Sequence, residues 1–357
     1  MKKSIGLLIL MSGMLTIFGG CLRNDDEPLL PQRPISRLYV SFENYEEDET
    51  QEPYRNLAVI DPADTTGMKV TIDYDSEVMG GAGVHFNPFA GIIFQGSAGD
   101  TTIRMMTVTD LGIPKNDGFI GFNELTAVRG LWYQNSSQML YVVNNATPTA
   151  VYGYHQPMNR NGYARPNKVY RLGSMRPWGL AMWGDSLLVG RTGQNGGISL
   201  YGGLSDTDSL EANFAPRSTL TIEGSTSIRG IAFSEELDLL VAADYGNANV
   251  DGCIFIIENA TALLSEPEST VRPTHVLRGT RTGLISPIDV AIDPREGKRY
   301  LYVADAGGNG KIARFNLDDN GNVTPNAVVE GFARNRIPAG IFLDARGRTN
   351  SDIDSTN

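Results

Sequence analysis

The chain has 357 residues, and its 30 Lys and Arg against 41 Asp and Glu give a formal net charge of −11. Such an acidic chain, which has no basic stripe, is a poor partner for nucleic acid or for a bare anionic membrane surface, so both are excluded as partners. It contains two cysteines, Cys21 and Cys253. Cys253 begins the apolar run Cys253–Ile257, which predicts a buried thiol rather than a nucleophile.

Residues 1–20 have the pattern of an export signal. Lys2 and Lys3 precede an apolar run from Ile5 to Phe18, and two glycines come before Cys21. The run is shorter than the about 20 residues that a helix needs to cross a bilayer. The segment ending at Cys21 resembles the lipobox of bacterial lipoproteins, which implies cleavage before Cys21 and acylation of its thiol, with palmitate among the acyl chains. An ordinary signal peptide followed by an incidental cysteine is the alternative.

Residues 21–35 read as a flexible tether, because prolines and polar residues alternate and no apolar pattern is present. The acidic cluster Asp25–Glu27 resembles the export signal of surface-exposed Bacteroidota lipoproteins, and a solvated acidic linker is the alternative. Together these segments predict a chain that is held in the outer membrane by its lipid, and they leave open the periplasmic and the extracellular side. Loss of the signal removes Lys2 and Lys3 and no acid, so the mature charge is −13.

An acidic loop, residues 43–52, follows the first predicted strand and carries six carboxylates in ten residues. Such a loop could hold a hard divalent cation such as calcium, but its ligands lack the fixed spacing of a known calcium loop, so a solvated acidic loop is the favoured interpretation. Asp318–Asn322 is also calcium-like and is first interpreted as a hairpin turn. The sequence predicts no other cofactor.

From residue 83 onwards one pattern repeats: a glycine and three apolar residues, then about ten residues later a second apolar run. The repeats start at Gly83, Gly130, Gly179, Gly230, Asp289 and Gly340, with separations of 47, 49, 51, 59 and 51 residues. Periods of this length with four short strands each are typical of the blades of a β-propeller.

The sixth repeat stops after its first strand, and the chain enters a polar tail over residues 346–357. Three N-terminal segments, Arg37–Ser41, Leu57–Asp61 and Lys69–Asp73, match the second, third and fourth strands that this repeat lacks. We therefore predict an all-β, six-bladed propeller over residues 36–345, whose ring is closed by one C-terminal strand pairing with three N-terminal ones. Such closure removes the open edge of a linear array.

The fifth repeat, from Ser286 to Ile312, resembles an NHL repeat, and the blade from Arg229 resembles it in part. This resemblance implies a six-bladed propeller of the gluconolactonase-like or TolB-like group. That group includes metal-dependent lactonases as well as proteins that bind ligands or other proteins without chemistry. The resemblance to the lactonases implies that Asn144, Asp244 and Asp305 could supply part of a metal site. The Glu-Gly-Pro segment of those enzymes has no counterpart in this chain.

In a propeller the loops before each first strand and those between second and third strands share one face around the channel. This placement predicts ligand-binding residues at the channel mouth, namely His85, Arg129, Asn144, Trp178, Arg191, Arg229, Asp244, Asp289 and Asp305. Arg129 and Arg229 hold equivalent places in two blades, and guanidinium groups suit the carboxylate of an acidic sugar or a peptide. As the alternative, each arginine pairs with Asp244, Asp289 or Asp305 and joins neighbouring blades.

No catalytic constellation is evident, because the three histidines fall in different blades at different strand positions and no nucleophile elbow is present. The leading hypothesis is a non-catalytic lipoprotein of the cell envelope that binds an unknown small molecule or envelope protein on the channel face. A metal-dependent lactonase, hydrolase or lyase that acts on a sugar or a related small molecule is the alternative, and a scaffold in an envelope complex is a third.

Overall fold

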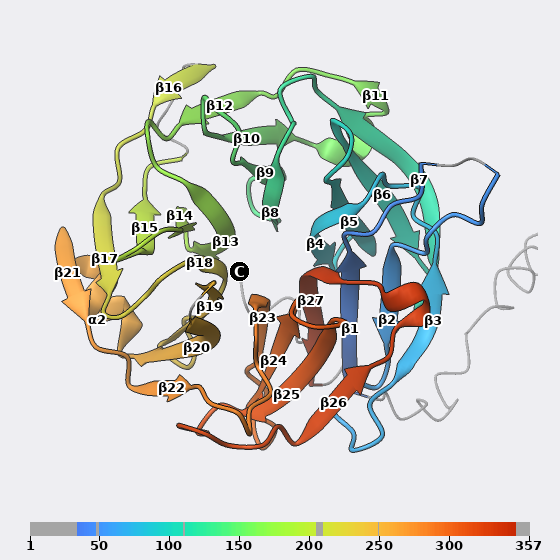
Figure 1. Ribbon diagram of the computed structural model, residues 1–357. Coiled ribbons are helices and arrows are strands. Elements are labelled where there is room, and N and C mark those ends of the chain that lie inside the picture. The colour runs from blue at the N-terminus through green and yellow to red at the C-terminus, as the bar shows by residue number, and fades with distance from the viewer. Residues whose placement is uncertain (1–33, 48–49, 110, 205–209, 249, 348–357) are drawn as a thin grey trace, which may run out of the picture. The chain divides into compact units, whose positions relative to one another are not determined.

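The computed structural model describes residues 34–47, 50–109, 111–204, 210–248 and 250–347, which form one unit beginning at Pro34. Six sheets surround a central axis and confirm the predicted six-bladed propeller (Figure 1). The predicted export signal, Cys21, most of the tether and the tail from residue 348 lie outside the described residues. Among the residues described, none of the helices has the length and apolar character needed to cross a membrane.

Three sheets, A to C, follow one another around the ring, each with its innermost strand at the axis. From the axis outwards, sheet A consists of β27 (Pro338–Arg346), β1 (Ile35–Phe42), β2 (Leu57–Ile60) and β3 (Val70–Tyr74). Sheet B consists of β4 (Gly81–Asn87), β5 (Ile92–Ser97), β6 (Thr102–Val108), β7 (Pro114–Gly121) and β11 (Gly162–Tyr163). Sheet C consists of β8 (Val128–Gln134), β9 (Met139–Asn144), β10 (Ala150–His155), β12 (Lys168–Arg171) and β16 (Glu211–Asn213).

The other three sheets, D to F, continue around the ring. Sheet D consists of β13 (Pro177–Trp183), β14 (Ser186–Arg191), β15 (Gly197–Tyr201), β17 (Ser218–Ile222) and β21 (Glu268–Val271). Sheet E consists of β18 (Ile228–Ser234), β19 (Leu239–Asn247), β20 (Val250–Glu258) and β22 (His275–Leu277), and sheet F of β23 (Pro287–Asp293), β24 (Tyr300–Asp305), β25 (Lys311–Asn316) and β26 (Ala327–Glu330). One short helix, α2 (Ala260–Ser265), and two 3-10 turns, Pro157–Asn159 and Ala333–Asn335, lie between strands.

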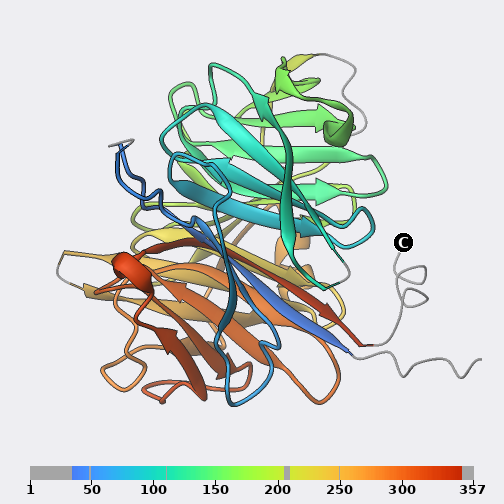
Figure 2. The same cartoon turned by 90° about the vertical axis from the view of Figure 1, so that its right-hand side faces the viewer.

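The ring closes in sheet A, as the sequence predicts. Strand β27 is antiparallel to β1, with Leu38 opposite Leu343 and Val40 opposite Ile341. Figure 2 shows the two strands side by side, one blue and one red. The pairing spans Ile35 to Arg346, one residue beyond each predicted boundary of the propeller.

The second strands form the centre of the core, because they are covered by neighbouring sheets on both faces. Strand β9 is buried along its whole length. A strand that is buried on both faces is expected to be continuously apolar rather than alternating, and Leu140 to Val143 fits this rule. Between sheets C and D, for example, Tyr141 and Val143 share one apolar cluster with Val189.

Three sheets carry a fifth strand that the repeat pattern did not predict. Strands β11, β16 and β21 each lie in the connection between the third and fourth strands of one blade and pair in parallel with the fourth strand of the preceding blade. Each therefore covers an outer edge whose backbone groups would otherwise face solvent.

Candidate functional site

A β-bulge at the start of every innermost strand shapes the channel mouth. In sheet C, Val128 faces Asn144 and Leu131 faces Val142, so that Arg129 and Gly130 together face one residue of β9. The same shift occurs in the other five sheets. A bulge re-aims the side chain of its extra residue. The extra residues form a ring around the mouth: Ala82, Arg129, Trp178, Arg229, Ile288 and Ala339.

The glycine after the extra residue lets adjacent blades approach closely. A Cβ atom on Gly83 would lie 2.2 Å from the carbonyl oxygen of Arg129, and one on Gly179 would lie 2.5 Å from that of Arg229. Neither distance is possible for a side chain, so these positions require glycine. The glycine of the sequence repeat thus lets neighbouring inner strands come close together directly after Arg129, Trp178 and Arg229.

These three residues form a stacked cluster, which we call the Arg–Trp–Arg cluster. The guanidinium carbon of Arg129 lies 4.3 Å from the centre of the Trp178 ring system, and that of Arg229 lies 4.1 Å from it. Arg229 also lies 3.5 Å from the ring centre of Tyr245. Attraction between a cation and an aromatic face holds both side chains in place without neutralising their charge.

The charge of the cluster is only partly balanced by the protein. Among the described residues, no carboxylate oxygen lies within 4.0 Å of a guanidinium nitrogen of Arg129 or Arg229, and the buried Nε atoms of both have no hydrogen-bond partner. Burial lowers the pKa of both arginines, and Glu43 opposes that shift. A buried N–H group without an acceptor is costly, so an anionic acceptor at this point would be stabilised.

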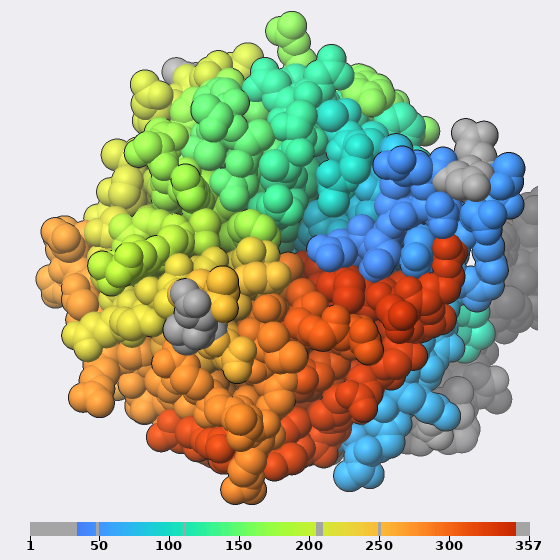
Figure 3. Space-filling view, viewed as in Figure 1, coloured from blue at the N-terminus to red at the C-terminus, as the bar shows by residue number. Residues whose placement is uncertain are grey.

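Glu43 is the carboxylate that approaches this cluster. It follows β1 directly and lines the same cavity as Arg129 and Arg229. Although Glu43 is exposed at the rim, loss of hydration raises the pKa of its carboxyl group, and the two arginines oppose the shift. Figure 3 looks onto this face and shows the segment after β1, in blue, reaching towards the centre of the ring.

Two adjoining cavities occupy the channel. The one at the mouth has a volume of about 230 Å³ and is lined by Glu43, the two arginines and Trp178. The second has a volume of about 220 Å³ and extends from Arg129 and Trp178 along the inner strands. Ligand sites are typically concave, mostly apolar and supplied with a few convergent polar groups, which matches this arrangement.

Of the predicted site residues, the structure brings Arg129, Trp178 and Arg229 together and adds Asp289 deeper in the channel wall. Asp289 stands where the other repeats have glycine. Its Oδ2 accepts the N–H of Ile341 at 2.8 Å and its Oδ1 accepts that of Val290 at 2.9 Å. Burial raises the pKa of Asp289 to about 7, against the effect of these two hydrogen bonds.

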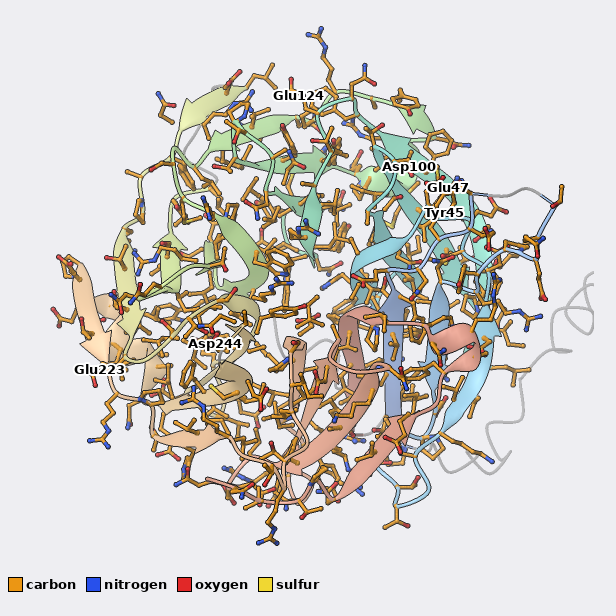
Figure 4. All side chains as sticks on the ribbon, viewed as in Figure 1. Tyr45, Glu47, Asp100, Glu124, Glu223 and Asp244 are labelled. Carbon is orange, nitrogen blue, oxygen red and sulfur yellow. The ribbon has the colours of Figure 1, made fainter. Side chains whose placement is uncertain are left out.

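Asn144, Asp244 and Asp305 are drawn away from the channel by their own backbone contacts. Asp244 accepts the N–H groups of Thr226 and Ser227, each at 2.7 Å, and Asp305 accepts those of Ile285 and Ser286. Figure 4 shows Asp244 within sheet E beside β18 and β19.

Asn144 acts in the same way in sheet C and accepts the N–H of Ala127 at 2.9 Å. These three side chains tie the loop before an innermost strand to the end of the second strand. The alternative, in which Arg129 and Arg229 pair with Asp244, Asp289 or Asp305, is not what the structure shows, because these three carboxylates bind backbone N–H groups instead.

His85 and Arg191 also lie outside the cluster. His85 packs in the channel wall between Trp132 and Phe342, with ring centres 4.9 and 4.4 Å away, and burial lowers its pKa to about 3. Arg191 donates to Thr221 Oγ1 at 3.1 Å. Sequence reasoning did not single out Tyr245 as a neighbour of the cluster, although Tyr245 directly follows the predicted Asp244. It singled out the acidic loop that begins with Glu43, but as a calcium-like segment and not as a neighbour of the arginines.

Among their described residues, the calcium-like segments hold no clustered ligands, and Asp48 and Glu49 of the acidic loop lie outside the described residues. Of the acidic loop, Glu46 pairs with Arg334 at 2.9 Å. Figure 4 shows Tyr45 and Glu47 on the side of the ring where sheet B lies, away from its centre. Asp319 accepts the N–H of Asn316, as in a hairpin turn. In the part of the chain that the structure describes, no group of three His, Cys, Asp or Glu side chains could hold a metal ion.

Comparison with protein family models and with curated proteins finds no match for this chain. Solved structures share its fold. A nidogen/laminin complex aligns with a TM-score of 0.54 and 13% identity over 87% of this chain and 98% of that chain. A candidate 6-phosphogluconolactonase from Bacteroides fragilis aligns with a TM-score of 0.52 and 10% identity, with the same coverage. A functionally unknown protein from Desulfotomaculum acetoxidans has a TM-score of 0.50, 13% identity and coverages of 78% and 75%. Such low identities show the fold alone.

Proposed function

We propose that this chain is a lipid-anchored binding protein of the cell envelope, whose channel mouth takes a small anionic molecule with a carboxylate group. One observation carries the binding proposal. The stacked guanidinium groups of Arg129 and Arg229 keep unpaired, buried Nε–H groups beside a cavity of about 230 Å³. Charge-assisted bonds from arginine to a carboxylate are the strong form of hydrogen bond, and in this cluster their donors are already held in place.

The planar geometry of the cluster favours a carboxylate over a spherical anion. Each guanidinium carbon lies over the Trp178 ring system, and a guanidinium group carries its N–H donors in a fixed planar fork that matches the two oxygens of a carboxylate. Glu43 leaves the mouth with one net positive charge when its carboxyl group is ionised, which suits a ligand with a single negative charge. An acidic sugar or the terminal carboxylate of a peptide has such a group.

The rival hypothesis of a metal-dependent lactonase, hydrolase or lyase has weaker support. The aspartates that it would use as ligands, Asp244 and Asp305, bind backbone N–H groups of the neighbouring loops. The fold shared with a candidate 6-phosphogluconolactonase and the NHL-like fifth repeat fit either hypothesis equally well. Binding at the Arg–Trp–Arg cluster is therefore the function that we favour.

The experiment is titration of the purified propeller, from residue 34 onwards, with acetate, glucuronate and inorganic phosphate, followed by calorimetry. We expect acetate and glucuronate to bind, and Arg129→Gln and Arg229→Gln each to weaken binding about tenfold to a hundredfold, because each removes a charge-assisted bond. Arg176→Gln is the matched control, since Arg176 is exposed in the loop before β13. Equal affinities in all three variants would contradict the proposal.

The envelope location rests on the lipobox-like segment and the tether that leads to β1 at Ile35. Fractionation of cells that express the full chain tests it separately. We expect the wild-type chain to sediment with outer membranes and Cys21→Ser to be released. A Cys21→Ser chain that stays with the membranes would show that Cys21 is not the anchor.

A further inference from the structure

The channel becomes apolar below the Arg–Trp–Arg cluster. The cavity that extends from Arg129 and Trp178 is lined further down by Trp132, Phe233 and Phe342. It runs along β18 from Gly230 to Ser234, four residue steps, or about 13 Å at the usual rise of a strand. The site therefore has two parts, a cationic mouth and an apolar lower channel.

Small residues on one side keep the lower channel open. Three positions after the extra residue of the bulge, sheets B and D carry His85 and Ala181, whereas the four inner strands whose residues line the cavity at this position carry Trp132 in sheet C, Phe342 in sheet A, Ala232 in sheet E and Ala291 in sheet F. All four side chains line the cavity. The two aromatic rings thus face a wall of alanines, and the space between the two walls remains unfilled.

The level between the cationic mouth and the lower channel, which we call the waist, presents no unbonded carboxylate among the described residues that line the cavity. Asp289 lies at this level, but both of its carboxyl oxygens accept backbone N–H groups, from Val290 and from Ile341 across the blade boundary. An apolar group that passes the waist therefore meets an aspartate whose two oxygens already accept hydrogen bonds. It reaches an environment that favours removal from water.

We propose that the occupant of this site is a small amphipathic carboxylate, whose head group binds Arg129 and Arg229 and whose apolar body fills the lower channel between Trp132, Phe342 and the alanine wall. The proposal rests on the proposed function, because the head group uses the same guanidinium groups. It adds the class of ligand, namely a short-chain or branched fatty acid or an aryl-substituted acid. A purely hydrophilic acid would leave the apolar part of the cavity unused.

The test compares acids that share one head group and differ only in chain length. Acetate, butyrate, hexanoate and octanoate are titrated into the propeller at constant pH and ionic strength. Each methylene that leaves water raises affinity about fourfold, so hexanoate is expected to bind at least tenfold more tightly than acetate, with little further gain once the cavity is full. Ala232→Leu and Ala291→Leu fill the lower channel and should remove this gain without weakening acetate. Ala212→Leu, on the outer strand β16, is the control for added volume elsewhere.

The possible results separate the two proposals. If affinity is the same for all four acids and still depends on Arg129 and Arg229, the mouth binds anions but the lower channel takes no part, and the inference is wrong. If no acid binds, the proposed function and the inference about the lower channel are both wrong. If chain length raises affinity equally in the Ala232→Leu variant, the apolar body lies elsewhere and the inference is again wrong.

Discussion

Asp289 stands at a position where the other repeats have glycine, and its side chain adds contacts to both neighbouring blades. Its neighbour in the ring, Gly230, has no room for a Cβ atom, because the Asp289 Oδ1 would lie 2.2 Å from it. Asp289 therefore fills the space that the missing side chain of Gly230 leaves, and it bonds to Ile341 in the next blade. This contact joins sheets F and A next to the closure of the ring.

The raised pKa of Asp289 makes stability depend on pH. The folded state keeps the proton up to a pH of about 7, whereas an unfolded Asp loses it near its ordinary value of 3.8. Protons are then bound more tightly in the folded state, so the free energy of unfolding falls as the pH rises from about 4 to about 7. We expect Asp289→Asn to remove this loss, so that its free energy of unfolding relative to wild type rises by about 1–3 kcal/mol between pH 4.5 and pH 8.

Urea unfolding at the two pH values measures this difference. Any constant cost of losing one hydrogen bond cancels, because only the change between the two pH values is compared. Asp117→Asn, an exposed carboxylate on β7, is the control for the same chemical change in solvent. A relative stability of Asp289→Asn that does not change with pH would show that Asp289 titrates normally.

At the scale of elements, the loops before the innermost strands depend on the side chain that ends the second strand. Asp244 has four hydrogen bonds to the segment around Thr226 and Ser227 and to Gly246. Asn144 has two, one accepted from Ala127 and one donated to the carbonyl oxygen of Glu124. The same position thus holds a charged acceptor in one blade and a neutral group in another.

This difference predicts that loss of the Asp244 side chain destabilises the protein more than loss of the Asn144 side chain. We expect Asp244→Ala to lower the free energy of unfolding by about 2–4 kcal/mol, because it leaves several backbone N–H groups without an acceptor. Asn144→Ala should cost about 1–2 kcal/mol, because fewer and neutral bonds are lost. Urea unfolding gives the totals, and amide hydrogen exchange at Thr226 and Ser227 shows whether the loop before β18 opens. An unchanged exchange rate there in Asp244→Ala would contradict the assigned role.

The elements also show why sequence reasoning succeeded in the fold and only partly in the site. The regular spacing of Gly130, Gly179 and Gly230 reflects a close approach between neighbouring blades, which recurs around most of the ring, so the count and the closure could be predicted. Strands β11, β16 and β21 could not, because each has two to four residues and pairs with another blade. The equivalence of Arg129 and Arg229 was visible in the repeat. Their stacking on Trp178 depends on the β-bulge, which could not be predicted from the sequence.

At the scale of the whole molecule, stability depends on a sheet that contains both ends of the propeller. Strand β27 has the neighbouring inner strands β23 and β4 on either side in the ring, and it is held in sheet A by pairing along the whole of β1 rather than by a hairpin. Opening the ring within sheet A requires the backbone hydrogen bonds of this pair to break. The boundaries between blades depend instead on side-chain packing, loop contacts and, at three of them, the short outer strands β11, β16 and β21.

Circular permutation tests this role. A short Gly/Ser linker can join Ile35 and Arg346, which are direct neighbours in the register. Opening the linked chain between Gly184 and Asp185, in the turn between β13 and β14, creates a new composite sheet D and should keep the wild-type unfolding rate. Opening it between Gly173 and Ser174, between blades C and D, leaves no composite sheet and should raise the unfolding rate about tenfold or more. Equal rates for the two permutants would contradict the role of the closure.

The closing pair also sets an order of events during synthesis. Val40 and its partner Ile341 are 301 positions apart, so at about 5–20 residues per second the partner emerges about 15–60 s later. Throughout this interval the inner edge of β1, which includes the fully buried Tyr39 and Val40, has no native neighbour. The strand of the propeller that leaves the ribosome first therefore gains its inner neighbour only when the last strand of the ring has been made.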